Sequence, residues 1–392
     1  MKTLKLRIKD KHANVLIQMA SEVNFVWNYC NELCFKHLQR TGNFFSAFDL
    51  SKYTAGSTKT GLSLQSHTVQ AVAEELVTRR KQFKKAKLNW RVSNPNSPKK
   101  SLGWIPFKAS GIKCQNGQVR YAGHWFGLWD SYGLSKYKVK MGSFVQDSRG
   151  RWYVCLVVDT PEPTQVTESK TPVGIDLGLK DFATLSNGQK IEAQRTYRKY
   201  QQKLGIAQRA NQKQRVKSIH AKIKNIRSDF QHKLSRQLVN DHAAIFVGNV
   251  NAKGLAKTKL AKSVLDAGWS AFRTMLKYKC QQAGVWFEEV NEAYTTQTCS
   301  YCGSRCDSPK GRAGLGIREW TCQQCGTLHD RDVNAAKNIL AAGHCRLAVG
   351  IPVLRSSASQ VGEDVKMLIN HQQDVSRIAD LLCGAILRGL LV

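Results

Sequence analysis

Four cysteines form two pairs with the spacing that metal sites use. Cys299 and Cys302 make one Cys-x-x-Cys pair, and Cys322 and Cys325 make a second pair nineteen residues further on. Each pair can supply two thiolates from one tight turn, and tetrahedral Zn²⁺ takes four such ligands. Because four protein ligands leave no position open for a substrate, the spacing predicts a structural zinc ribbon at residues 299–326.

The remaining cysteines lack this spacing. Cys306 and His329 lie near the two pairs in the sequence, and their simplest interpretation is a packing residue and a loop residue. Free cysteine usually packs as a small apolar side chain. That role is expected for the other seven cysteines: Cys30, Cys34, Cys114, Cys155, Cys280, Cys345 and Cys383.

Three acidic residues stand at positions where a carboxylate could bind a metal, cap a helix or form an ion pair. Asp176 ends a short apolar stretch, where an unpaired carboxylate is costly to bury. A turn-forming aspartate would be the simple explanation, but Gly174 and Gly178 beside it allow close approach of backbone or ligand. Asp330 and Asp332 open the last predicted helix, which indicates that one caps or pairs while the other binds a metal.

Phosphodiester hydrolysis by two Mg²⁺ ions uses about three carboxylates that converge on one point. Asp176 and Asp332 can converge if the first strand and the last helix of one sheet domain are neighbours. The sequence therefore predicts a catalytic Mg²⁺ site that contains both acids.

The composition points to a polyanionic partner. Among 392 residues, 60 Lys and Arg stand against 28 Asp and Glu, which gives a net charge of +32. A protein this basic usually meets nucleic acid, and a chain of this length suggests two or three domains. No stretch of 18 apolar residues is present, and the first residues lack an apolar signal core. We therefore expect a cytoplasmic protein without a membrane partner.

The first half reads as a β-rich body interrupted by helices. Apolar residues alternate at the start of the chain and then recur every three or four positions. Asn116-Gly117 is a strong signal for a hairpin turn. The predicted strands are 2–9, 112–115, 118–121, 136–146 and 151–158, and the predicted helices are 12–38 and 66–87.

The second half changes to an RNase H-like α/β order. Three strands are followed by a long basic helical stretch, a strand, a helix, a strand and a final helix. The predicted strands are 173–177, 182–185, one after Asn187-Gly188, 244–247 and 285–290, and the predicted helices are 194–240, 263–283 and 333–342.

Basic residues on two predicted helical stretches are candidates for contact with a nucleic-acid backbone. A solvated face is the alternative explanation for such charge runs. The candidates are Arg79, Arg80, Lys84, Lys85, Lys87, Arg195, Arg198, Lys199, Lys203, Arg215 and Lys222. Aromatic residues among the basic ones could stack on bases or pack in the core: Phe83, Trp90, Trp104 and Phe107.

Three motifs resemble the TnpB family: GIDLG (174–178), YTTQTCSYCG (294–303) and DRDVNAAKNI (330–339). TnpB proteins are transposon-encoded RNA-guided nucleases, once described as transposases and similar to the type V CRISPR effectors. Over residues 170–345 the resemblance rests on specific motifs. Over the first 160 residues it rests only on the general layout of the predicted elements. By motif position, Asp176 would be the first acid of the RuvC site and Asp332 the last.

The resemblance also implies an architecture and partners. The partners would be a guide RNA derived from the transposon end and target double-stranded DNA with a short adjacent motif, near the prokaryotic nucleoid and without a small-molecule substrate. The implied fold is a multidomain α/β and β protein. It comprises a wedge β-barrel with a helical recognition insert at 1–160, a linker at 161–172, a RuvC-like domain at 173–298 with a basic insert at 194–240, the zinc ribbon at 299–326, the last RuvC-like helix at 327–345 and a tail at 346–392.

One position departs from the family pattern. The middle acid of the family usually follows the strand that ends near Val247, but this chain has Gly248 there. A relocated acid is one explanation, because Glu292 follows the strand expected beside 244–247; Glu288 and Glu289 are fallback candidates. The other explanation is an RNA-guided DNA-binding repressor that does not cut. A transposase acting on the ends of its element, or an RNA-processing factor, is a third class.

Overall fold

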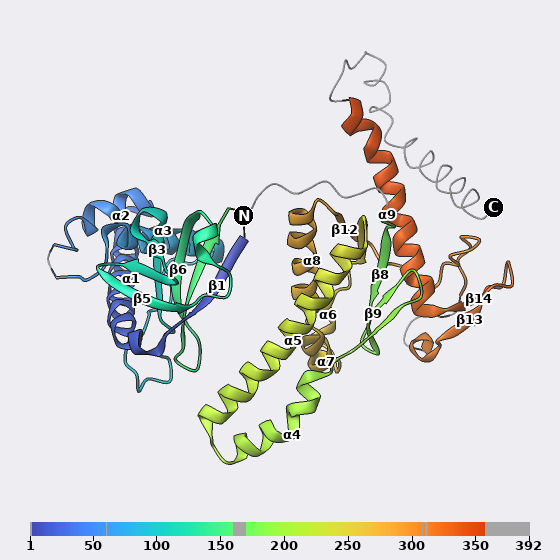
Figure 1. The fold of residues 1–392 in the computed structure, drawn as a ribbon, viewed down its shortest axis with the longest axis horizontal. Helices are drawn as coiled ribbons and strands as arrows, with labels where there is room; N and C mark the ends of the chain where they lie inside the picture. The colour runs from blue at the N-terminus through green and yellow to red at the C-terminus, as the bar shows by residue number, and fades with distance from the viewer. Residues whose placement is uncertain (1, 60, 160–169, 308, 310–312, 357–392) are drawn as a thin grey trace. The chain divides into compact units, whose positions relative to one another are not determined.

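The computed structural model describes residues 2–59, 61–159, 170–307, 309 and 313–356 (Figure 1). The chain divides into two compact units, Met1–Pro161 and Glu162–Val392, and each unit is described by itself. Most of the predicted linker and the predicted tail after residue 356 lie outside the described residues. Within those ranges, no helix is long and apolar enough to cross a membrane.

The first unit is built on a seven-stranded antiparallel sheet with the order β2-β6-β7-β1-β5-β4-β3. This order has two ends, so the sheet is open where the resemblance implied a barrel. Its strands are β1 (Lys2–Ile8), β2 (Trp104–Lys108), β3 (Lys113–Gln115), β4 (Gln118–Tyr121), β5 (His124–Trp129), β6 (Val139–Gln146) and β7 (Trp152–Val158).

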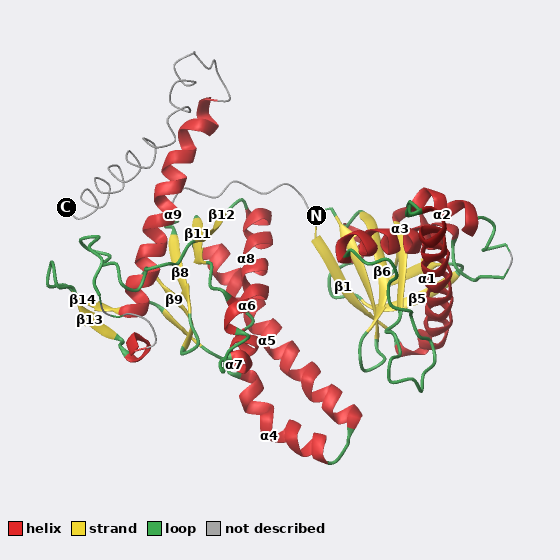
Figure 2. Ribbon diagram, turned by 180° about the vertical axis from the view of Figure 1, so that it is seen from behind, coloured by secondary structure: helices red, strands yellow, loops and turns green. Residues whose placement is uncertain are grey.

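Three helices complete this unit: α1 (Ala13–Thr41), α2 (Ala47–Thr54) and α3 (Ser66–Phe83). The alternation of β1 buries Leu4, Leu6 and Ile8, as the sequence predicted. These side chains share one apolar core with the inward faces of α1 and α3, which lie beside the sheet (Figure 2). The end of α3 comes earlier than predicted, because Lys84 takes a left-handed conformation with φ of 51°.

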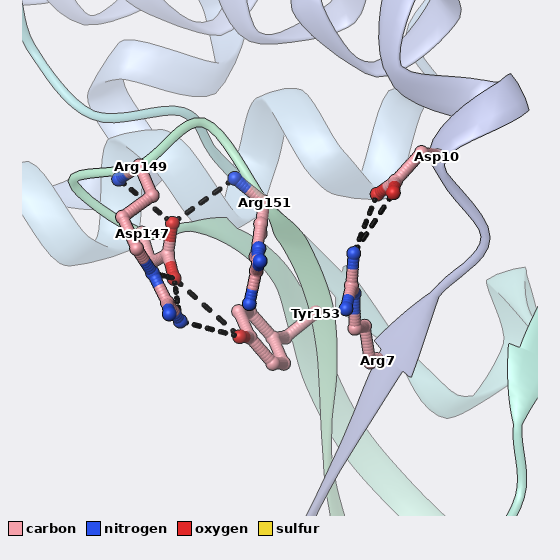
Figure 3. Close-up of polar contacts among 6 residues, drawn as sticks. All are labelled: Arg7, Asp10, Asp147, Arg149, Arg151 and Tyr153. Atoms are coloured by element: carbon pink, nitrogen blue, oxygen red, sulfur yellow. Dashed lines mark hydrogen bonds and ion pairs between the residues drawn. The ribbon is translucent and has the colours of Figure 1, made fainter. Parts of the chain in front are cut away.

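Two predicted hairpins of the first unit are confirmed. Asn116 and Gly117, between β3 and β4, have φ of 48° and 66°, as a type I′ turn requires. The turn between β6 and β7 is fastened by the carboxylate of Asp147, which accepts the backbone N–H groups of Arg149 and Arg151 and pairs with the Arg149 guanidinium (Figure 3).

The second unit contains a five-stranded sheet with the order β10-β9-β8-β11-β12. Strands β8, β9 and β10 are antiparallel, whereas β11 runs parallel to both β8 and β12. The predicted neighbouring of the last two strands is therefore confirmed. The strands are β8 (Val173–Leu177), β9 (Asp181–Leu185), β10 (Lys190–Glu192), β11 (Ala244–Gly248) and β12 (Trp286–Val290).

Helices cover both faces of this sheet (Figure 1). One face shares a core with α5 and α8, and the other packs against α9. A Cβ atom on Gly174 would lie 2.2 Å from the carbonyl oxygen of Ala336, so only glycine lets α9 lie this close to β8. The helices are α4 (Thr196–Arg209), α5 (Lys213–Asp241), α6 (Ala252–Leu255), α7 (Ala261–Ala267), α8 (Trp269–Ala283) and α9 (Arg331–Ser356).

Three predicted helices of this unit have different limits in the structure. The stretch 194–240 is two helices, because Asn211 takes a left-handed conformation with φ of 50°. The stretch 263–283 is interrupted at Gly268, where φ is 67°. The last helix, at residues 331–356, extends beyond the predicted helix 333–342 in both directions. A two-stranded sheet, β13 (Glu319–Thr321) and β14 (Leu328–Asp330), precedes that helix.

Candidate functional site

The predicted zinc ligands meet in one cluster. Both Cys-x-x-Cys segments form the same turn, in which the N–H of Gly303 or Gly326 donates to the carbonyl of the first cysteine at 2.9 Å. Both glycines have positive φ, at 76° and 71°. Sulfur atoms of four residues lie within 4.8 Å of one another, as a tetrahedral thiolate site requires: Cys299, Cys302, Cys322 and Cys325.

His329 and Cys306, which were expected to be a loop residue and a packing residue, both lie beside this cluster. The Nε2 atom of His329 lies 3.0 Å from Sγ of Cys299, and His329 is buried on β14. The sulfur of Cys306 lies 3.8 Å from that of Cys322. A hydrogen bond between a metal ligand and a neighbouring side chain is the kind of contact that orients the ligand.

The three candidate acids come from three elements of the second unit. Asp176 is near the end of β8, Glu292 follows β12, and Asp332 lies in the first turn of α9. The pKa of Asp176 is raised to about 7, first by burial and then by the negative charges of Asp332 and Glu292, against the opposing charge of Arg331. The fold therefore brings Asp332 and Glu292 close enough for the charge of each to act on Asp176.

Glu292 fills the space in front of Gly248. A Cβ atom built on Gly248 would lie 2.8 Å from Oε2 of Glu292 and 3.2 Å from the Ile339 side chain. The backbone N–H of Glu292 donates to Oδ1 of Asn249 at 3.3 Å, and burial raises the pKa of its carboxyl, partly offset by Arg273. A carboxylate is thus present where a side chain at position 248 would point, although it comes from the neighbouring strand.

The two acids at the start of α9 differ in role. One oxygen of Asp330 accepts the backbone N–H groups of Asp332 and Val333 at 3.0 Å, and the other pairs with Lys190 at 2.5 Å. The charge of Asp332 instead acts on Asp176, and its Oδ2 forms an ion pair with Nη1 of Arg318 at 3.0 Å. Both acids form ion pairs, but only Asp330 caps α9, and only Asp332 acts on the charge of Asp176.

Sequence reasoning missed the residues that fasten this site. The side-chain amides of Asn334 and Asn338 both donate to the carbonyls of Thr295 and Thr298, and Asn334 accepts the N–H of Ser300. They tie the segment between Glu292 and the first cysteine turn to α9. The signal was present as two asparagines one helical turn apart, which share a face.

The fallback acid Glu289 is engaged elsewhere. It forms an ion pair with Arg273 on α8, with an N–O distance of 2.9 Å. Among the described residues, the four cysteines form a group whose ligand atoms all lie within 4.8 Å of one another, and the three carboxylates do not form such a group. Two-metal sites hold their ions about 3.5–4 Å apart, so their ligands need not all touch.

The predicted nucleic-acid contacts fall into two groups. Those on and beside α4 and α5 are exposed: Arg195, Arg198, Lys199, Lys203, Arg215 and Lys222. In the first unit Lys84 and Lys85 are exposed, but Arg79 pairs with Glu75 and Lys87 with Glu32, each at 2.6 Å. Arg80 lies inside the unit rather than on its exposed face, with 4% of its surface accessible.

The four candidate aromatic residues also divide. Phe107 is part of the core of the first unit, with 2% of its surface exposed. The stacking interpretation of this residue is therefore wrong. Trp104 is half-buried against the same core. Phe83 and Trp90 are exposed, so both remain able to meet a base.

Replacing Asp176 with asparagine is expected to change how the stability of the magnesium-free protein depends on pH. Because the folded-state pKa of about 7 lies above the ordinary value of 3.8, this group favours folding at low pH, and that contribution is lost as the pH rises from about 4 to about 7. The melting temperature of the wild type should fall relative to that of Asp176→Asn across this range, measured by thermal unfolding without added Mg²⁺. Parallel pH profiles would contradict the assigned environment.

The second unit combines an α/β sheet domain, the candidate acids and an adjoining cysteine cluster. Two parts of it also match known family models. Residues 155–259 match a family model described as "Probable transposase", and residues 269–339 match "Cas12f1-like, TNB domain". The matches confirm the predicted resemblance to the TnpB family.

Two curated relatives of this chain are both named as putative RNA-guided DNA endonucleases. A "Putative RNA-guided DNA endonuclease" of Streptomyces pristinaespiralis is 39% identical over 220 residues, which are 52% of this chain and 53% of the relative. The "Putative RNA-guided DNA endonuclease InsQ" of Escherichia coli (strain K12) is 35% identical over 234 residues, 53% of this chain and 57% of the relative. The chain spans about half the length of the curated relatives it matches.

A solved structure supports the fold. The chain in "Cryo-EM structure of the Cas12f1-sgRNA-target DNA complex" aligns with a TM-score of 0.55 and 13% sequence identity, covering 84% of this chain and 83% of that chain. At this identity the likeness concerns the fold alone.

Proposed function

We propose that this chain is an RNA-guided DNA endonuclease of a transposable element, which hydrolyses phosphodiester bonds of target DNA. The observation that carries the proposal is the carboxylate of Glu292 in the space before Gly248, beside Asp176 and Asp332. The names of the curated relatives support the same activity.

Asp176, Glu292 and Asp332 would hold Mg²⁺, and their donor set suits that ion because Mg²⁺ prefers carboxylate oxygens. Bound Mg²⁺ would activate water and stabilise the leaving oxygen. The residues of the chain have separate tasks. Asp330 fixes the start of α9 through its cap, and Asn249 supports the backbone of Glu292.

The cysteine cluster would hold a structural Zn²⁺, because four thiolates at the observed spacing complete a tetrahedral shell. The exposed cations of α4 and α5 suit the backbone of a guide–target heteroduplex, which the protein would hold without reading its bases. The partners in this proposal are a guide RNA from the transposon end and double-stranded DNA with a short adjacent motif.

The test uses protein purified with its co-expressed RNA and a matched DNA duplex in the presence of Mg²⁺. We expect cleavage by the wild type and a large loss of cleavage rate in Asp176→Ala and in Glu292→Ala. Glu289→Ala is the matched control, because Glu289 lies on the adjoining strand but pairs with Arg273, and it should still cut.

Other outcomes identify the alternatives. Guide-dependent binding without nicking by the wild type would support a repressor. Strand-transfer products on element ends would support a transposase. Cleavage that survives Glu292→Ala but not Glu289→Ala would move the third acid to Glu289.

A further inference from the structure

A cavity of about 480 Å³ lies in the first unit, between the segment before α2 and the C-terminal end of α3. Phe44, Phe45 and Arg80 are among its lining residues. Lys81, Lys84 and Lys85, called the lysine rim below, also line it, and no lining residue is acidic. The cavity therefore combines flat apolar surface with concentrated positive charge.

Arg80 brings a buried charge to this cavity. One guanidinium nitrogen, Nη2, donates to the carbonyl of Ala86 at 3.0 Å, and the group lies 4.5 Å from the ring centre of Phe44. Its Nε and Nη1 atoms are buried without a hydrogen-bond partner, and within the described ranges no carboxylate forms an ion pair with it. The nearby thiol of Cys34 is only a weak acceptor.

An unpaired buried cation is costly, so an anion held in the cavity would offset that cost. The three rim lysines would attract such an anion. A phosphate group has the required charge and forms strong hydrogen bonds with both arginine and lysine.

A phosphate group alone would not explain the aromatic residues that line the cavity. Phe45 is already stacked on His37, with 3.7 Å between ring centres and 12° between planes. Phe44 has 51% of its surface exposed although a guanidinium lies over its ring. An exposed ring beside a phosphate-binding group is the arrangement by which proteins stack an unpaired base.

We propose that this cavity takes one unstacked nucleotide of a bound single strand, with its base against Phe44 and its phosphate near Arg80 and the lysine rim. The proposal rests on nucleic acid as the partner of this chain, but not on cleavage. It also gives Arg80 a role that differs from the exposed backbone contact expected from the sequence.

The stacking part is tested by fluorescence anisotropy with the full chain, freed of copurifying RNA, without Mg²⁺. The probes are short labelled single strands of RNA, of DNA and of abasic deoxyribose phosphate. We expect Phe44→Ala to weaken binding of base-bearing strands by about 5- to 100-fold. Phe48→Ala is the matched control, because Phe48 is exposed on α2 and does not line the cavity, and it should change affinity by less than about twofold.

The abasic strand separates stacking from charge. Phe44→Ala should leave its affinity unchanged, whereas Lys81→Gln/Lys84→Gln should weaken binding of every strand more than Lys99→Gln/Lys100→Gln does. Each double variant removes two exposed lysine charges, so both lower the net charge of the protein by the same amount. The RNA and DNA arms show which strand supplies the nucleotide.

Equal effects of Phe44→Ala and Phe48→Ala, or an equal loss with the abasic strand, would overturn the proposal. All four variants change exposed residues, so folding should be retained, which circular dichroism checks. Because no Mg²⁺ is present, failure here leaves the proposed nuclease untouched, and an inactive nuclease site would not alter these affinities.

Discussion

Glu292→Ala is expected to lower the rate of DNA cleavage by about 10²- to 10⁴-fold while guided DNA binding stays intact. A metal ion at a hydrolytic centre contributes several kcal/mol to the transition state, and each 1.36 kcal/mol is a factor of ten in rate. Losing one of three carboxylates should forfeit much of that contribution. Cleavage rates on matched duplex, together with binding measured in Ca²⁺, separate the two effects.

A second substitution makes this prediction sharper. In the Glu292→Ala background, Gly248→Glu should recover at least about tenfold of the lost rate, because position 248 points into the space that the Glu292 carboxylate leaves. In the wild-type background the same change should reduce cleavage, since two carboxylates would then compete for one space and repel each other.

Gly248→Gln in the Glu292→Ala background is the matched control. It has nearly the size of glutamate but no charge, so it should not restore cleavage. A Gly248→Glu change that is equally harmful in both backgrounds would contradict a shared position for the two carboxylates.

Local chemistry accounts for what the sequence predicted well. The Cys-x-x-Cys turns and the Asn116-Gly117 hairpin are set by a few neighbouring residues, so short motifs identify them. Choosing Glu292 as a candidate required a prediction about residues far apart in the sequence, namely that the strand before Glu292 lies beside the strand ending at Gly248. The parallel pairing of β11 with β12 confirms that these two strands are neighbours.

The sequence failed where single residues depart from a periodic pattern. Asn211 takes a left-handed conformation inside a polar helical run. Asparagine tolerates this conformation better than most residues, but a single asparagine in a run of polar residues does not by itself predict a break. Arg80 falls within a run of cations, yet the helix turns its side chain inward while Arg79 stays outside. Which member of a charged run is buried depends on how α3 packs against α1, and a charge count does not contain that information.

Removing metal from the cysteine cluster is expected to stop cleavage as well as to destabilise the second unit. Structural zinc sites contribute roughly 10–16 kcal/mol of apparent binding free energy in small domains, so the cysteine turns should lose their order without it. The segment that leads into the first cysteine turn contacts both α9 and Glu292. The backbone N–H of Ser300 donates to the side chain of Asn334 on α9, and the hydroxyl of Thr295 donates to the carbonyl of Glu292 at 2.9 Å.

Loss of order at this turn should therefore displace Glu292 relative to Asp332. A zinc-specific chelator should lower both the melting temperature and the cleavage rate, the latter by at least about tenfold, and Zn²⁺ added back should restore both. Cys322→Ser should behave like the chelated protein, whereas Cys155→Ser, in the first unit and outside the cluster, should not.

Asn334→Ala tests the link itself. The variant keeps all four thiolates and should retain zinc, measured by metal analysis, but it removes the contacts that join Thr295, Thr298 and Ser300 to α9. Cleavage should fall by about 10- to 100-fold, as it does when groups that orient metal ligands are lost. Normal cleavage by a zinc-free protein would contradict the link, because the cysteine turn would then have no part in holding Glu292 beside Asp332.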